Sequence, residues 1–366
     1  MATLLREIRS TPLLWLLVLV PVALVAEAIK PEAHTFLFIL SVLAIVPLAA
    51  LLSRATEAVA SRTGDMIGGL LNATLGNLTE LLIALAALRA GQYVLVKASI
   101  AGAIVTNSLF MLGASFLLGG LRHHVQDFNR NSARLQAGLL FLATIAILIP
   151  SVAVDVDASV SSAAFTQDLS AWLSVLLITT YGLGLLFSLH THREFFTSAG
   201  PADSHEAEWP MSLALGTLVG VTVLVALVSE IFVESVQQAA TALGLSPAFV
   251  GFIIVALVGG AAEMVAAFSA ARKNRLDLSV GIALGSASQI ALFVAPILVL
   301  LSYVLGPTPM NLQLWPGAVA MILIASMTAS LVTNTGRSAW FVGALVTVVY
   351  FIFALTLYLL PPQVAS

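Results

Sequence analysis

The sequence contains no cysteine and very little charge. Without cysteine there are no disulfide bonds, thiolate metal sites or cysteine nucleophiles. Asp, Glu, Lys and Arg make up 9% of the residues, whereas a soluble domain carries about 25%. Hydrophobic residues make up 60% of the 366 positions, too many for a water-soluble surface. The composition therefore predicts a polytopic membrane protein whose main partner is the lipid bilayer. A net charge of −3 with no basic tract argues against nucleic acid as a partner.

Eleven apolar segments are long enough to cross a bilayer, which takes about 20 residues of helix. The connections between them are short, so the sequence leaves no room for a soluble domain. The longest polar stretch, 190–210, is acidic and is interpreted as a cytoplasmic linker. A solvated loop is favoured there over a short regulatory helix. The predicted spans are 12–29, 33–56, 65–88, 94–119, 135–154, 168–189, 211–234, 246–270, 277–304, 314–333 and 339–360.

The distribution of Lys and Arg predicts the orientation of these spans. With a cytoplasmic N-terminus, twelve of the fifteen basic residues fall on the cytoplasmic side, and only Lys30, Arg89 and Lys97 fall outside. This bias follows the positive-inside rule. We therefore expect an integral protein of a prokaryotic cell (inner) membrane, with its N-terminus in the cytoplasm and its C-terminus outside.

An internal repeat relates two buried acidic residues. Glu80 and Glu263 are each the lone acid of an apolar helix, and they lie 183 positions apart. Each follows a short glycine-containing pair, Gly76-Asn77 in one case and Gly259-Gly260 in the other. In the helices that follow, two further glycines, at positions 102 and 285, repeat with the same spacing.

The repeat predicts an all-α architecture of one leading helix and two five-helix units. We expect the leading helix in 1–32, the first unit in 33–189, the acidic linker in 190–210 and the second unit in 211–366. Because five is odd, the second unit enters the membrane from the opposite side. Inverted units place matching residues at the same depth near a pseudo-two-fold axis, which is where secondary transporters bind their substrates.

The residue types around the glutamates favour a hard cation. An ionisable residue at the bilayer centre costs roughly 2.5–3.5 kcal/mol, so a function is expected for it. The polar groups nearby all offer oxygen, and Ca²⁺ takes 6–8 oxygen ligands at about 2.3–2.6 Å. Without thiolate or imidazole on these helices, Zn²⁺ and Cu⁺ fit poorly. The candidate cation ligands are Glu80, Glu263, Asn107, Gln289, Ser286, Gly76 and Gly259, and the candidate pathway or surrounding residues are Asn72, Asn77, Thr106, Ser99, Glu57 and Glu230.

Structural roles compete with these assignments. A single membrane glutamate can simply hydrogen-bond a neighbouring helix, but the symmetric pair of acids favours the ion-binding interpretation. For Glu57 and Glu230 the sequence leaves open whether they line entry routes or are solvated at the membrane surface. For Asn72 it leaves open a helix-packing amide or a direct ligand.

A charge argument suggests an exchange mechanism. Two ionised glutamates facing each other at low dielectric are costly, because burial and like-charge repulsion both favour the protonated form. One divalent cation neutralises the pair, and so do two protons. Competition between the two predicts exchange of one Ca²⁺ for at least two H⁺, with no cofactor.

The sequence resembles the calcium/proton (cation/proton) antiporter family of the calcium/cation antiporter superfamily. The similar segments are "TEAVASRTGDMIGGLLNATLGNLTELLIALAAL", "SIAGAIVTNSLFMLG" and "GGAAEMVAAFSAARKNRLDLSVGIALGSASQIALFVAP", which cover most of residues 50–305. The resemblance implies an eleven-helix fold in which Glu80 and Glu263 alternately hold Ca²⁺ and protons. It also implies a regulatory role for the acidic stretch.

The chain departs from the family pattern at three positions. The second signature usually reads GNAAEH, but here Gly260 replaces the Asn and Met264 replaces the His. Ala103 stands where a Ser is common. These changes leave fewer side-chain donors around the second glutamate.

Two other classes remain open on the sequence alone. One is a sodium-coupled or monovalent cation exchanger of the same superfamily, and the other is a cation channel. An enzyme is not expected, because no nucleophile–base arrangement is found. The sequence does not decide between a monomer and a homo-oligomer.

Overall fold

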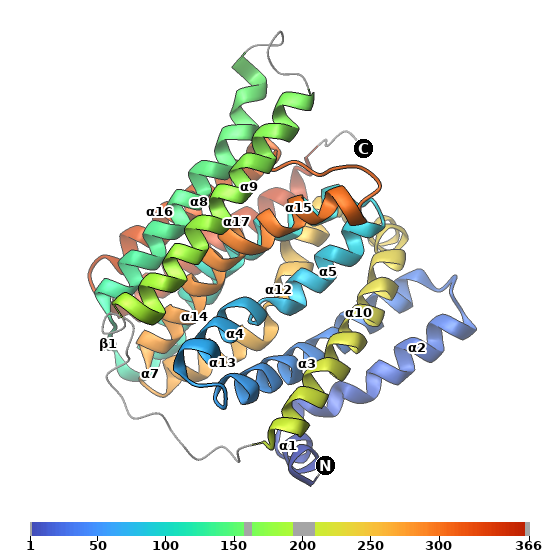
Figure 1. The fold of residues 1–366 in the computed structure, drawn as a ribbon, viewed down its shortest axis with the longest axis horizontal. Helices are drawn as coiled ribbons and strands as arrows, with labels where there is room; N and C mark the ends of the chain where they lie inside the picture. Colours follow the sequence, from blue (N-terminus) through green and yellow to red (C-terminus); the bar gives the residue numbers. More distant parts are fainter. Residues whose placement is uncertain (1, 157–162, 193–208, 363–366) are drawn as a thin grey trace.

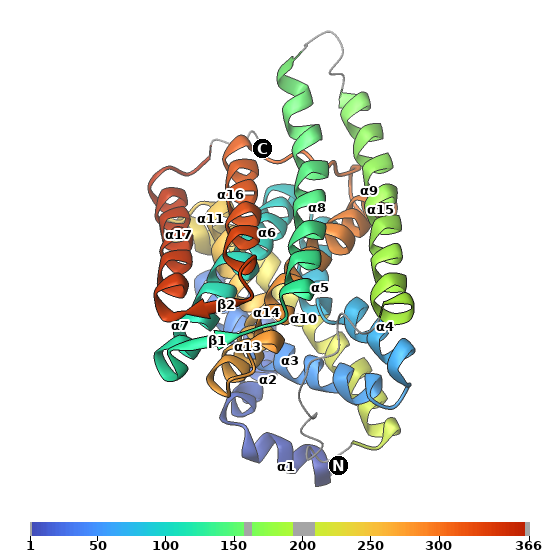
Figure 2. The ribbon, with the colours of Figure 1, turned by 90° about the vertical axis from the view of Figure 1, so that its left-hand side faces the viewer.

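The computed structural model describes residues 2–156, 163–192 and 209–362, and most of these residues lie in helices packed side by side (Figures 1 and 2). The predicted acidic linker falls largely on 193–208, outside the described residues. The first part of the chain contains α1 (Ala2–Ser10), the 3₁₀ helix η1 (Pro12–Val18), α2 (Leu19–Ile29), α3 (His34–Ala60), α4 (Asp65–Leu75), α5 (Leu78–Arg89), α6 (Tyr93–Val105), the π-helix η2 (Thr106–Met111), α7 (Leu112–His123), β1 (Val125–Asp127), α8 (Arg130–Val156), α9 (Ala163–Leu186) and the π-helix η3 (Phe187–Thr191).

The second part repeats the helical character of the first. It contains α10 (Met211–Ala242), α11 (Pro247–Phe249), the π-helix η5 (Val250–Val255), α12 (Ala256–Gly259), α13 (Ala261–Arg272), α14 (Leu276–Gln289), the π-helix η6 (Ile290–Val294), α15 (Ala295–Leu305), α16 (Pro316–Thr333), β2 (Arg337–Ala339) and α17 (Trp340–Leu359). Figure 2 shows α1 at one end of the molecule, while α17 runs from β2 toward the other end.

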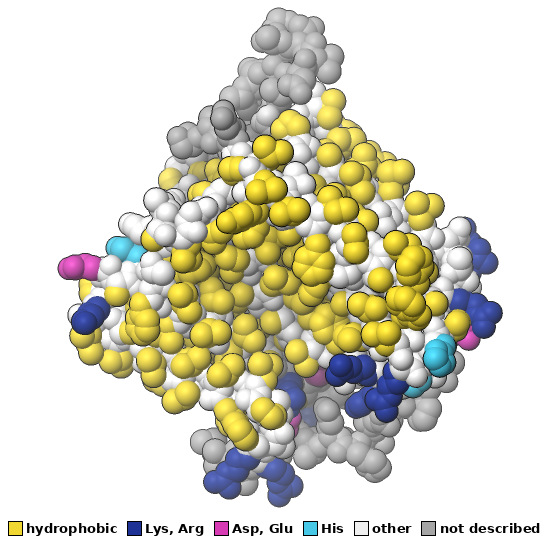
Figure 3. Space-filling model, turned by 180° about the vertical axis from the view of Figure 1, so that it is seen from behind, with side chains coloured by type: hydrophobic (Ala, Val, Ile, Leu, Met, Phe, Trp, Pro, Cys, Tyr) yellow, Lys and Arg dark blue, Asp and Glu magenta, His cyan; other side chains and the backbone are white. Residues whose placement is uncertain are grey.

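The described residues contain eleven segments able to span a membrane, as the sequence predicts. Nine are helices long and apolar enough by themselves. The other two are bent pairs: Ile67–Leu75 with Leu78–Arg89, at 43°, and Pro247–Gly259 with Ala261–Arg272, at 58°. In Figure 3 hydrophobic side chains cover the middle of the visible face, and charged side chains lie at its margins, as expected of a surface in lipid.

One helix end differs clearly from prediction. The apolar pattern predicts a span ending at 234, but α10 continues to Ala242. The added turns carry the exposed amides Gln237 and Gln238. Hydropathy marks the part of a helix that lies in lipid, whereas backbone hydrogen bonding lets the helix continue into water. As a result Glu230 lies within α10 rather than near its end.

A close backbone contact joins α6 to η5. A methyl group on Gly102 would lie 2.1 Å from the carbonyl oxygen of Phe252, so no larger residue fits there. Gly251 makes the matching approach to α6, where a methyl group would lie 2.7 Å from the Cβ of Ala98. Small residues of this kind let membrane helices pack at short distance. The contact holds the first half of one broken span against α6.

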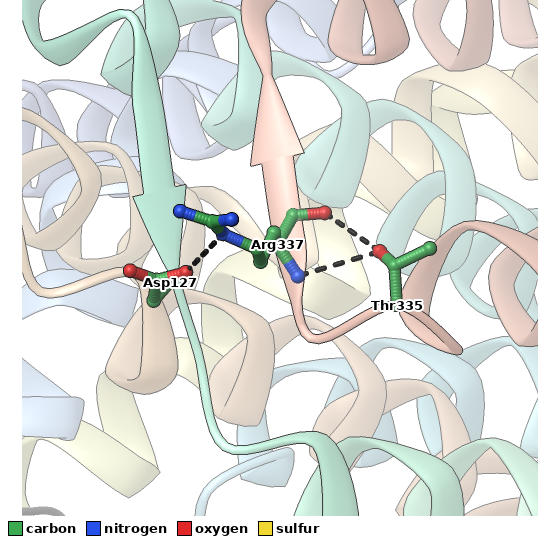
Figure 4. Close-up of polar contacts among 3 residues, drawn as sticks. All are labelled: Asp127, Thr335 and Arg337. Carbon is green, nitrogen blue, oxygen red and sulfur yellow. Dashed lines mark hydrogen bonds and ion pairs between the residues drawn. The ribbon is translucent and has the colours of Figure 1, made fainter.

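A two-stranded ribbon that the sequence did not predict joins two distant loops. β1 and β2 pair antiparallel, with Gln126 opposite Ser338. Figure 4 shows the ion pair between Asp127 Oδ1 and Arg337 Nε at 2.6 Å, beside the turn held by Thr335. Both ion-pair side chains are largely exposed, so the pair contributes little stability. The ribbon ties the α7–α8 connection to the α16–α17 connection.

Candidate functional site

The two predicted glutamates occupy equivalent places in the broken spans. Glu80 is the third residue of α5, and Glu263 is the third residue of α13. The first turn of a helix has free backbone N–H groups and a partial positive charge, both of which favour a carboxylate. The breaks at Asn77 and Gly260 therefore create a new helix start inside each span, where an acid is better tolerated than in an unbroken helix.

The site brings the two broken spans into contact. A methyl group on Gly259 would lie 2.9 Å from Cγ and 3.4 Å from Oε1 of Glu80, so that side chain lies directly against the break in the other span. Glu80 is buried, with 8% of its surface exposed. Glu80 and Glu263 lie close enough for their charges to interact. The structure thus brings together two acids that are 183 residues apart.

A continuous chain of hydrogen bonds runs beside the glutamates. The Asn107 amide nitrogen donates a hydrogen bond to Ser286 Oγ at 2.8 Å. The Ser286 hydroxyl in turn donates to Asn77 Oδ1 at 2.6 Å. The Asn77 amide nitrogen then donates to Gln289 Oε1 at 2.7 Å. Ser286 also lies beside the carboxylate of Glu263, although its one hydroxyl proton is donated to Asn77. This network places four predicted polar residues next to the acids and orients their oxygens.

Two π-helical segments lie at the same place in the helices that supply this network. Asn107 is the second residue of η2, and Gln289 immediately precedes η6. A π turn inserts an extra residue into a helix and is frequent at functional sites. The turn redirects the side chains around it, which accounts for both amides reaching the centre of the molecule.

A cavity of about 420 Å³ leads to Glu263 from the surface. Near its outer end it is lined by Glu57, close to the end of α3, and by Asn129, at the start of α8. Deeper, it reaches Ser286 and Gln289. Asn72 of α4 and Gly76, directly after α4, form part of its wall. The cavity therefore connects one face of the molecule with one of the two acids, while Glu80 lies behind it against Gly259.

Three predicted pathway residues lie apart from this cluster. Ser99 Oγ donates to the carbonyl of Val96 in its own helix at 2.8 Å. Thr106 Oγ1 is 3.4 Å from the hydroxyl of Tyr350. The carboxylate of Glu230 pairs with Arg89 at 3.3 Å and is half exposed. Helical spacing places Ser99 and Thr106 on one face of the helix, but in the structure neither side chain hydrogen-bonds to the network beside the glutamates.

The cavity also contains polar residues that sequence reasoning missed. Asp277 lies in the first turn of α14, and Gly281, Gly285 and Gln289 follow it at intervals of four, so all four share one face of the helix. That spacing is a signal that could have been read from the sequence. Gln136 of α8 also lines the cavity, and nothing in the local sequence marks it.

The chemistry of the site suits a hard cation. In the residues that the structure describes, no three His, Asp or Glu side chains gather as a metal site, so neutral oxygens must complete any shell around the two acids. Glu263 Oε2 and Asn107 Oδ1 are buried and accept no hydrogen bond from the described residues. A buried acceptor without a partner costs about 1–3 kcal/mol, which a bound cation or proton would remove.

Broken membrane helices that meet at buried polar groups are typical of secondary transporters. Residues 33–190 and 213–359 match the family model described as "Sodium/calcium exchanger protein", and the chain belongs to this family. It is 37% identical to the "Ca(2+)/H(+) antiporter" of Aphanothece halophytica, over 96% of this chain and 98% of the relative. It is 40% identical to the "Ca(2+)/H(+) antiporter ChaA" of Bacillus subtilis (strain 168), over 88% and 92%. The crystal structure of the Ca2+/H+ antiporter protein YfkE superposes with a TM-score of 0.79 at 34% identity, covering 94% of this chain and 99% of that one.

Proposed function

We propose that this protein exchanges Ca²⁺ for H⁺ across a prokaryotic cell membrane. The observation that carries the proposal is the pair formed by the buried Glu80 and the partly buried Glu263, held at the two helix breaks with amide and hydroxyl oxygens around it. The relatives named as Ca²⁺/H⁺ antiporters support Ca²⁺ and H⁺ as the exchanged ions.

The charge balance of the site explains the exchange. Glu80 is buried and Glu263 is partly buried at the inner end of the cavity, so a doubly ionised pair is unfavourable without a cation. One Ca²⁺ or two protons leave the site nearly neutral, and either loaded form can be occluded. Because the ions compete for the same oxygens, apparent Ca²⁺ affinity rises with pH.

An asymmetry between the two halves supports alternating access. Gly102 packs directly on the backbone at Phe252. The repeat spacing of 183 residues relates this pair to Gly285 and Gly69. Gly285 instead faces the cavity, where its nearest neighbour is the Gln136 amide nitrogen, 3.8 Å from a methyl group placed on it. In the alternate state α4 would close onto α14, and α6 would separate from η5.

The predicted organisation fits this mechanism. The two segments that match the family model, 33–190 and 213–359, support two units that follow a leading helix. The cavity mouth lies near Glu57 and Asn129, on the face that the basic residues assign to the cytoplasm. In this orientation the present state takes its cation from the cytoplasm.

Replacement of either glutamate tests the proposal. In proteoliposomes without Na⁺, an imposed pH gradient should drive ⁴⁵Ca²⁺ uptake by the unaltered protein. Glu80→Gln and Glu263→Gln each remove the charge that Ca²⁺ neutralises, so uptake should fall to that of empty liposomes. Glu32→Gln, at an exposed position, is the matched control. Near-normal uptake by either site variant contradicts the assigned role.

A sodium-coupled exchanger is the second candidate. It is favoured by Gly260 and Met264, which supply no hard ligand beside Glu263. The same liposomes separate the alternatives: uptake that requires a Na⁺ gradient and ignores a pH gradient identifies this class. Ca²⁺ flux that requires neither a Na⁺ gradient nor a pH gradient identifies a channel.

A further inference from the structure

The carboxamide of Gln136 has no partner in the part of the chain that the structure describes. Its Oε1 is buried and accepts no hydrogen bond. The side chain nevertheless forms part of the wall of the cavity that leads to Glu263. Its nitrogen is directed toward Gly285, at 3.8 Å from the position that a methyl group would take there. A polar group is therefore kept in the cavity without a protein contact to account for it.

No hydrogen bond from α14 reaches the Oε1 of this amide in the part of the chain that the structure describes. Gly285 lies beside the amide nitrogen and has no side chain, and neither has Gly281 one turn earlier in the cavity wall. A methyl group on Gly281 would have nothing within 4 Å, so this stretch of helix borders open space. A partner for the amide must therefore enter through the cavity.

The charges in the cavity indicate the kind of partner. Its walls carry the carboxylates of Glu57, Asp277 and Glu263, and no Lys or Arg of the described residues lines it. The resulting potential concentrates cations and excludes anions. An amide oxygen is a suitable ligand for a hard cation and adds no charge of its own.

We propose that Gln136 contacts the transported cation, its amide oxygen binding Ca²⁺ between the cavity mouth and Glu263. This role rests on the proposed function and adds a ligand from α8, outside both broken spans. No hydrogen bond fixes the amide plane, so the oxygen is free to rotate toward the ion. A neutral ligand at this point also leaves the number of exchanged protons to Glu80 and Glu263, whereas a third carboxylate would change it.

A binding assay separates this role from a structural one. The thermal midpoint of the purified full-length protein is measured with and without CaCl₂. Without Ca²⁺, Gln136→Leu should unfold at the same temperature or higher, because it removes a buried acceptor that has no partner. The apparent Ca²⁺ affinity obtained from the midpoint shifts should fall about tenfold. Gln238→Leu, an exposed amide outside the cavity, should leave both values unchanged.

A charged variant provides an independent readout. At pH values where the new carboxyl of Gln136→Glu is protonated in the Ca²⁺-free protein, it must release that proton when Ca²⁺ binds. The slope of log apparent affinity against pH should therefore increase by about one proton per Ca²⁺. A residue that only supports the fold would not change this slope.

The possible failures are distinguishable. If the unaltered protein is not stabilised by CaCl₂ and does not exchange Ca²⁺ for H⁺, the proposed function fails and the role of Gln136 fails with it. If the unaltered protein does both, but Gln136→Leu binds Ca²⁺ equally well and Gln136→Glu keeps the original slope, the role of Gln136 alone is overturned. A lower Ca²⁺-free midpoint with unchanged affinity also overturns it, because that result identifies a structural amide.

Discussion

Gly259 illustrates how one residue determines the geometry of the site. A side chain there would overlap Glu80, so the close approach of the two spans depends on a position with no Cβ. Asn77 makes a comparable contribution. It sits where it could cap α5, yet its side chain bonds Ser286 and Gln289 instead. Both residues give up local helix stability in favour of contacts across the site.

At the residue scale, Asp277 should act as an electrostatic guide for entering cations. It lies in the cavity wall and makes no hydrogen bond or ion pair among the described residues. Asp277→Asn should raise the KM for Ca²⁺ about two- to fivefold at low salt, and less at 0.5 M salt, since exposed charges are screened. Initial uptake rates at two ionic strengths measure this effect. A change in maximal rate with unchanged KM would contradict a guiding role.

At the element scale, bent half-helices perform two tasks. The breaks at Asn77 and Gly260 place acids at helix starts, and they divide each span into segments that can pack differently. The contact of α6 with η5 is closed in this structure, whereas α4 and α14 stand on either side of a cavity. Exchange between two discrete packings is the expected form of such a transition.

Leucine substitutions at two equivalent glycines, Gly285 and Gly102, should have different effects. Gly285→Leu fits the open cavity but prevents α4 from approaching, so the protein should fold and bind Ca²⁺ while transport is lost. Gly102→Leu overlaps the backbone at Phe252 and should lower the thermal midpoint or prevent folding. Melting with and without CaCl₂, together with uptake, separates the two. Wild-type turnover by Gly285→Leu would argue against closure at this face.

At the scale of the whole molecule, the cavity faces only one side of the membrane. The chain has no cysteine, so one introduced thiol is unique. Gly281→Cys should react with a membrane-impermeant maleimide applied to the cytoplasmic side, because the cavity opens there in the predicted orientation. Gln238→Cys, near the end of α10, should react from the opposite side only. If each cysteine reacted from the other side instead, the predicted orientation in the membrane would be wrong.

The ribbon between β1 and β2 belongs to this scale as well. It connects loops from the two parts of the chain, and Phe128 next to it donates its backbone N–H to Gly336 at 2.9 Å. Phe128 also lines the cavity. The ribbon is therefore positioned to keep the residues at the cavity mouth in place while the half-helices move.

The membrane class, the eleven spans and the two acids could all be predicted from the amino-acid sequence. These features depend on composition and local hydropathy, and a lone glutamate in an apolar helix is conspicuous at any depth. The breaks were also indicated locally, by the pairs Gly76-Asn77 and Gly259-Gly260, each of which ends three residues before its acid.

The set of polar groups that share the site could not be predicted in this way, because it depends on how the helices pack. Asn77 bonds Gln289 across 212 positions and Asn107 bonds Ser286 across 179, while Ser99 and Thr106 turn elsewhere. Helical spacing gives the relative faces within one helix, but not the neighbour that each face meets. That neighbour depends on how bent and π-helical segments pack, which is why Gln136 became visible only in the folded chain.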